Sequence, residues 1–112
     1  MKTMSDLEMV DLGDLTFPGN LVFSGRGDGV DARVKAQLDA KDATGESYEI
    51  HIPDGTMTFT LSFFLGMFDA SILRLGSAAA FRKKYKFTGE PFPDLIKEGI
   101  AEALVRGPIR AI

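Results

Sequence analysis

The chain has 112 residues, of which 45% are hydrophobic and 26% are charged, so it has the size and composition of a single folded domain. Its net charge of −3 at pH 7 argues against a dedicated nucleic-acid module, and no apolar run approaches the roughly 18 residues that a membrane span needs. The absence of cysteine excludes disulfides, thiol nucleophiles and thiolate metal sites, and a single histidine excludes a multi-histidine metal site.

The first part of the chain is predicted to form an arm and two short strands. Residues 1–14 carry few apolar positions and four acidic ones, which predicts a loose N-terminal arm before a single domain at residues 15–112. The arm lacks the apolar core of a signal peptide, and we therefore expect a cytoplasmic protein. Residues 15–20 predict a short strand that ends in a Pro-Gly turn, and residues 21–23 predict a second strand.

A glycine-rich loop and one helix are predicted next. Residues 24–29 have the composition of a loop. Val30, Val34 and Leu38 recur four residues apart, so residues 30–40 predict an amphipathic helix that packs through these three side chains. The charges are uneven along the chain, with 5 Lys/Arg against 11 Asp/Glu through residue 56 and 8 against 5 after it. An acidic and a basic side are therefore available to partners.

The centre of the chain carries the clearest pattern. Residues 48–53 alternate between apolar and polar side chains, which predicts a strand, and Asp54-Gly55 predicts a turn. Residues 61–75 predict the longest helix, with Thr58 or Thr60 as its N-cap. Six apolar side chains form one stripe along this helix that is suited to packing on a sheet, namely Leu61, Phe64, Leu65, Phe68, Ile72 and Leu75.

Phe63 and Met67 lie off this stripe and give the same helix a second apolar face. Aromatic side chains and methionine are typical of protein contact surfaces, which favours a role in binding a partner. The competing interpretation is that neighbouring helices cover the second face completely. The two interpretations differ in the solvent exposure of these two side chains.

The last third of the chain predicts a short helix at residues 78–84, a strand at residues 85–88 and an amphipathic helix at residues 94–105. Strands that alternate with helices in a short chain indicate an α/β fold. We expect a small two-layer sandwich, in which a mixed sheet of about four strands is packed by three to four helices.

Other motifs carry weaker signals. Gly25, Arg26 and Gly27 combine open backbone amides, a helix start and a guanidinium, which together can hold an anion, but they lack the spacing of a phosphate-binding fingerprint. His51 has no recognisable nucleophile or metal-ligating partner, so we predict no catalytic residue, no metal and no cofactor. The basic run at residues 82–86 contains Tyr85 and is flanked by Phe81 and Phe87, three aromatic side chains that are suited to anchoring the chain in the core.

A strand, an Asp-Gly turn, a hydroxyl-bearing segment and an apolar helix occur in that order at Ile50–Asp54, Thr60–Phe63 and Leu75-Gly76. This layout resembles a STAS-like bacterial domain family of unknown function, which is related to the STAS domains of anti-sigma-factor antagonists. Ser24–Arg26, ahead of a helix, also fits the pattern. The resemblance implies a STAS-like sandwich that regulates other proteins, often through a kinase-like ATPase regulator. The position of the phosphorylated serine of STAS antagonists falls on Leu61 here.

We therefore expect a non-catalytic, regulatory protein–protein interaction module. The expected partner is a kinase-like ATPase regulator or a second copy of the chain, with no membrane contact. The alternatives are a homodimeric or mobile-element inhibitor protein, and a binder of small ligands or anions that uses the glycine-rich loop at residues 25–29. The predicted partner-binding surface surrounds the start of the long helix and comprises Thr58, Thr60, Ser62, Phe63, Met67 and, at its rim, Arg74.

Overall fold

The computed structural model describes residues 7–89 and 92–106. Its main sheet has three parallel strands in the order β1-β3-β5, and a second, parallel pair is formed by β2 and β4. The strands are β1 (Glu8–Asp11), β2 (Val22–Phe23), β3 (Tyr48–Ile52), β4 (Thr58–Phe59) and β5 (Tyr85–Gly89). The helices are the 3-10 helix η2 (Leu12–Leu15), α1 (Arg26–Ala36), α2 (Leu38–Asp42), α3 (Leu61–Leu75), α4 (Ala78–Lys84) and α5 (Pro93–Arg106).

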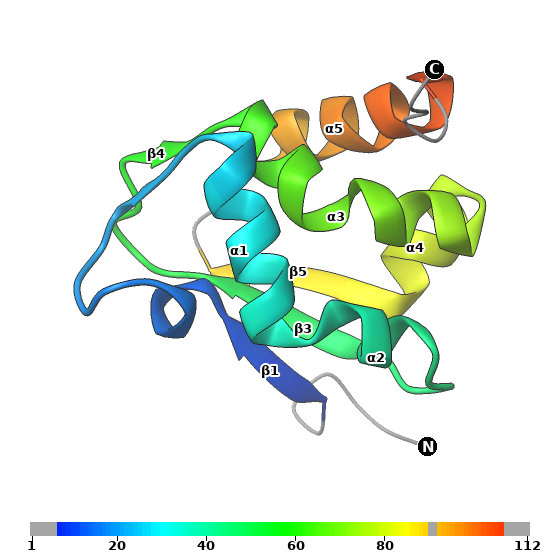
Figure 1. Ribbon diagram of the computed structural model, residues 1–112, viewed down its shortest axis with the longest axis horizontal. Helices are drawn as coiled ribbons and strands as arrows, with labels where there is room; N and C mark the ends of the chain where they lie inside the picture. Colours follow the sequence, from blue (N-terminus) through cyan, green and yellow to red (C-terminus); the bar gives the residue numbers. More distant parts are fainter. Residues whose placement is uncertain (1–6, 90–91, 107–112) are drawn as a thin grey trace.

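The helices lie on one side of the main sheet (Figure 1). The alternation along β3 explains this arrangement, because Tyr48, Ile50 and Ile52 are buried beneath the helices whereas Glu49 and His51 are half-buried on the other face. Helix α3 lies across the centre and carries eight buried residues. It begins at the N-cap Thr60 and ends at Gly76, whose φ of 90° is the left-handed conformation that favours glycine.

The α/β fold class is confirmed, and so are the elements with the strongest periodicity. Strands β3 and β5 and helices α3, α4 and α5 match the expected segments to within one residue or so. The expectation of one mixed sheet of about four strands is wrong for the described residues, which hold a three-stranded and a two-stranded parallel sheet. The hydroxyl-rich turn supplies the extra strand β4, which pairs with β2.

The expectation of a loose arm at residues 1–14 is wrong where the structure describes it. Residues 8–11 form β1, which pairs with β3, and the adjoining 3-10 helix buries Leu12 completely. Residues 1–6 lie outside the described part of the chain. The strand expected at residues 15–20 is also absent, because this segment ends the 3-10 helix and continues as a turn closed by Asn20 N donating to Phe17 O.

The expected helix at residues 30–40 is displaced and interrupted. Helix α1 begins at Arg26, inside the predicted loop, and it ends before Gln37, which adopts the left-handed φ of 56°. The expected core residues Val30 and Val34 are exposed, whereas Gly29, Ala32, Arg33 and Ala36 are buried. Small residues face the core here because α1 lies unusually close to α3.

Among the described residues, no single helix has the length and apolarity needed to cross a membrane. Helices α3 and α4 meet that criterion only as a pair, and the pair is bent by 112°. Most of α3 is buried inside the protein.

Candidate functional site

Helices α1 and α3 cross with their backbones in contact. A Cβ atom at Gly29 would lie 2.2 Å from the carbonyl oxygen of Phe63, and a Cβ atom at Gly66 would lie 2.2 Å from that of Arg26. Real Cβ atoms do not approach carbonyl oxygens so closely, so both positions require glycine at this separation of the helices. As a result, α1 covers the face of α3 that carries Phe63 and Met67.

The two apolar side chains of the predicted contact surface on α3 are therefore inside the protein. Phe63 is 1% exposed and Met67 is fully buried, so the expectation that they face solvent is wrong. The ring of Phe63 packs against Phe23 and Phe59, with centroid distances of 5.6 and 5.8 Å. The interpretation that neighbouring helices cover the second face is the correct one.

The three hydroxyl residues before and at the start of α3 have different environments. Thr60 Oγ1 accepts hydrogen bonds from Phe63 N at 3.2 Å and from Gly25 N at 3.3 Å, so this hydroxyl ties the starts of α1 and α3 together. Thr58 is half-buried in β4, where it pairs with Val22. Ser62 is exposed in the first turn of α3. Of the three, only Ser62 is exposed, and Thr58 and Thr60 are half-buried.

The candidate anion site at Gly25, Arg26 and Gly27 forms the start of α1. Gly25 is the N-cap residue with a φ of 87°, and a Cβ at Gly27 would meet no atom within 4 Å. The guanidinium of Arg26 pairs with the carboxylate of Asp69 on α3 at 3.0 Å. The charge of Arg26 is thus balanced by Asp69, and this ion pair joins α1 to α3. Arg26 is therefore a poor candidate for attracting an anion.

Arg74 lies at the other end of α3, roughly 18 Å from Ser62 along the helix axis. Its guanidinium pairs with Asp42 at 3.0 Å and with Asp39 at 3.4 Å. The structure therefore does not bring Arg74 together with the hydroxyl residues at the start of the helix.

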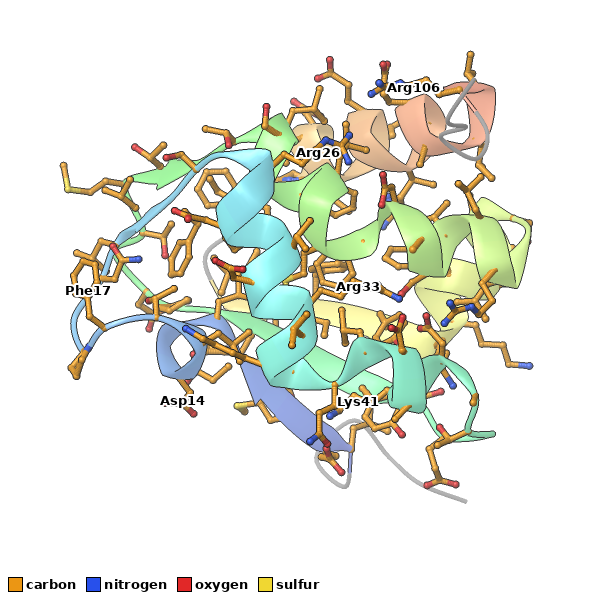
Figure 2. All side chains as sticks on the ribbon, in the orientation of Figure 1. Asp14, Phe17, Arg26, Arg33, Lys41 and Arg106 are labelled. Carbon is orange, nitrogen blue, oxygen red and sulfur yellow. The ribbon has the colours of Figure 1, made fainter. Side chains whose placement is uncertain are left out.

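Asp42 is the centre of a polar cluster that the sequence did not reveal. Its side chain is fully buried and accepts from Arg33 at 3.0 Å, Ser71 at 2.8 Å and Tyr85 at 2.5 Å, in addition to Arg74. Figure 2 shows Arg33 between α1 and the neighbouring helices, where it also donates to Met67 O and Ser71 Oγ. This cluster joins α1, α2, α3 and β5.

The cluster also changes the acid–base behaviour of two of its members. The hydrogen bond and the charge of Arg33 lower the pKa of Asp39 below its ordinary value. Burial, followed by the hydrogen bond to Asp42, raises the pKa of Tyr85 far above its ordinary value. Both shifts favour the protonation states that hold the cluster together, so the cluster is a structural clamp.

On the face of the main sheet that is opposite the helices, Glu49, Thr88 and His51 form a short hydrogen-bonded network. Thr88 Oγ1 donates to Glu49 Oε2 at 2.6 Å, and His51 Nδ1 lies 3.3 Å from the same hydroxyl. Because the hydroxyl of Thr88 donates its hydrogen bond to Glu49, His51 is not placed to activate this hydroxyl as a base. The described residues contain no group of three or more acidic or histidine side chains that could hold a metal ion.

Three large apolar side chains are exposed around the β2–β4 ribbon. Phe17 is 68% exposed, Val22 48% and Met57 77%; we call these three residues the loop patch. Phe17 and Val22 line the same concavity, and Met57 N donates to Leu21 O beside Val22. Figure 2 shows Phe17 at the outer end of the loop, away from the crossing of α1 and α3.

Comparisons of the chain with protein families, with curated proteins and with solved structures found no match. Sequence reasoning missed the loop patch because Phe17 and Val22 fit the pattern of short buried strands. Their exposure could have been predicted from their position beside Pro18-Gly19 and Asn20, because these residues favour a turn and turns lie at the surface.

Proposed function

We propose that the protein is a non-catalytic regulatory module that binds another protein through the loop patch. The observation that carries this proposal is that Phe17, Val22 and Met57 are exposed around one two-stranded ribbon, whereas the other exposed large apolar side chains are spread over β1, α1 and α5. Burying a large apolar side chain of this kind contributes about 1.5–3 kcal/mol, so a partner that covers all three gains substantial binding energy. Phenylalanine and methionine are also enriched in the centres of protein interfaces.

The proposed surface replaces the one centred on Phe63 and Met67, but it stays at the same end of α3. Met57 directly precedes β4, and β4 is followed by the N-cap Thr60 and the exposed Ser62. Among the three predicted hydroxyl residues, Ser62 is therefore the one that can lie at the rim of an interface. Thr60 is the N-cap of α3, and Phe63 and Met67 are part of the hydrophobic core.

The layout of β3, turn and α3 supports a STAS-like domain as the family of this module. Helices on one side of the main sheet, and a long helix that follows the central strand and carries the exposed Ser62 in its first turn, fit that proposal. On this basis the partner is a kinase-like ATPase regulator, and the domain acts in the cytoplasm. The proposal includes no cofactor, because the function is binding alone.

The test is capture of partners by the intact protein from a lysate of the organism that encodes it. The variant Phe17→Ser/Met57→Ser removes two apolar side chains of the loop patch. The control Met9→Ser/Val105→Ser removes two exposed apolar side chains elsewhere, one of 51% and one of 86% exposure. We expect the control to recover the same specific protein as the native chain and the patch variant to lose it. Equal recovery by both variants would contradict the proposal.

A further inference from the structure

We propose that the partner inserts a segment in which a lysine or arginine adjoins a large apolar side chain, and this inference rests on the proposed function. The receiving site is an open groove of about 470 Å³ between the 15–24 loop and α1. One wall carries the apolar side chains Leu15, Phe17 and Val22, and the wall from α1 carries Asp28, Asp31 and Lys35. Figure 1 shows the long loop standing away from α1 on this side.

The apolar wall explains why the segment must carry a large apolar side chain. Phe17 and Val22 are largely exposed and Leu15 is half-buried, so the wall has apolar area that the protein itself leaves uncovered. A side chain of leucine or phenylalanine size can cover this area within the volume of the groove. Its removal from water is the main source of affinity.

The charges of the α1 wall explain why the segment must be cationic. Asp28 and Asp31 are exposed, and neither makes an ion pair with any described residue. The dipole of α1 favours an acid at Asp28, in its first turn, but Asp31 lies beyond that turn. Lys35 lines the same groove and its ammonium donates to Leu15 O on the opposite wall at 3.3 Å, so the three charged side chains leave the groove with a net charge of −1. Two carboxylates therefore face the groove beside an apolar wall.

The edge of β2 explains why recognition occurs through side chains. Asn20 Nδ2 donates to Val22 O at 2.8 Å, and Val22 N donates to Asn20 Oδ1 at 3.0 Å. The amide of Asn20 thus occupies the two backbone groups that an added strand would need at this residue. A partner strand would have to displace Asn20, whereas a side chain can enter the groove directly.

The experiment uses short synthetic peptides and the intact protein. Each peptide has one central leucine in a glycine–serine background, flanked by arginines, by glutamates or by uncharged glutamines. Binding is measured by fluorescence anisotropy at low and at physiological ionic strength, for the native protein and two charge variants. Asp28→Asn/Asp31→Asn neutralises the groove, and the matched control Asp94→Asn/Glu98→Gln removes the same charge from exposed positions on α5.

We expect the arginine peptide to bind the native protein best and to weaken about tenfold in Asp28→Asn/Asp31→Asn but not in the α5 control. The difference should shrink at higher salt, because exposed charges are screened. Equal binding of arginine and glutamate peptides, or an unchanged affinity in the groove variant, would overturn the inference. If all three peptides bind equally and Phe17→Ser abolishes that binding, the inference fails while the proposed function stands. If no peptide binds and the patch variant still captures the cellular partner, both fail.

Discussion

Gly66 on α3 faces the backbone of Arg26 on α1 so closely that a Cβ atom at Gly66 would lie 2.2 Å from the Arg26 carbonyl oxygen. The same crossing places Gly29 against the carbonyl oxygen of Phe63. These two glycines let α1 cover the second apolar face of α3. They are the reason that the protein buries Phe63 and Met67, so these two side chains are not available as a contact surface.

A methyl group at the crossing should destabilise the fold. We expect Gly66→Ala to lower the free energy of unfolding by about 1–3 kcal/mol, because the helices must separate to admit the added atom. The control is Gly27→Ala on α1, where a Cβ meets nothing within 4 Å and where alanine should raise stability by up to about 1 kcal/mol. Urea denaturation followed by circular dichroism measures both. A Gly66→Ala protein as stable as Gly27→Ala would contradict the described crossing.

Removal of the carboxylate at the centre of the clamp should cost much more than removal of its exposed neighbour. Asp42→Ala leaves Arg33, of which 9% is exposed, without its buried counter-charge, and we expect a loss of about 3 kcal/mol in the free energy of unfolding. Asp39 is 76% exposed and Asp39→Ala should have a much smaller effect. Chemical denaturation of both variants compares them, and equal losses would show that Asp42 is not the centre of the clamp.

The phenol of Tyr85 makes the stability sensitive to alkaline pH. Burial and the hydrogen bond to Asp42 raise its pKa in the folded protein, whereas the unfolded chain has the ordinary value of about 10. The folded state therefore holds this proton more tightly, so the contribution is complete below pH 10 and is lost as the pH rises above it. Tyr85→Phe should lose about 1–2 kcal/mol at neutral pH and show a shallower alkaline decline. Parallel declines in the two proteins would refute this linkage.

Two hydroxyl residues at the start of α3 should differ in their contribution to stability: Thr60 is the N-cap, whereas Ser62 is exposed. Thr60→Ala removes the N-cap of α3 and the acceptor for Gly25 N, and we expect a loss of about 1–2 kcal/mol. Ser62→Ala changes an exposed side chain and should alter the stability by less than about 0.5 kcal/mol. Thermal unfolding distinguishes them; a larger loss in Ser62→Ala would contradict the assignment of the cap.

Periodicity predicted the elements in which large apolar side chains mark the buried face. The alternation of Tyr48, Ile50 and Ile52 predicted β3, and the dense apolar pattern of residues 61–75 predicted α3. The sequence left the N-cap of α3 open between Thr58 and Thr60, and the structure shows that it is Thr60. Strand β1 was missed because four residues with a single buried apolar side chain, Val10, carry little periodic signal.

Helix α1 shows why the candidate site could not be derived from sequence alone. Its buried face consists of Gly29, Ala32, Arg33 and Ala36, and none of these is a large apolar residue. The valines that display helical spacing are the exposed ones. Whether Phe63 is covered depends on how closely α1 approaches α3, and this distance is a property of two glycines 37 positions apart in the chain rather than of any local pattern.

The central claim is that the loop patch, and not the face of α3, contacts the partner. Its most direct test is photo-crosslinking in the living cell, with a photoreactive phenylalanine analogue placed at Phe17, at Met57 or, as a control, at the exposed Val105. We predict that the first two positions crosslink to one and the same protein and that Val105 does not. A crosslinked partner at Val105, with none at Phe17 and Met57, would contradict the account.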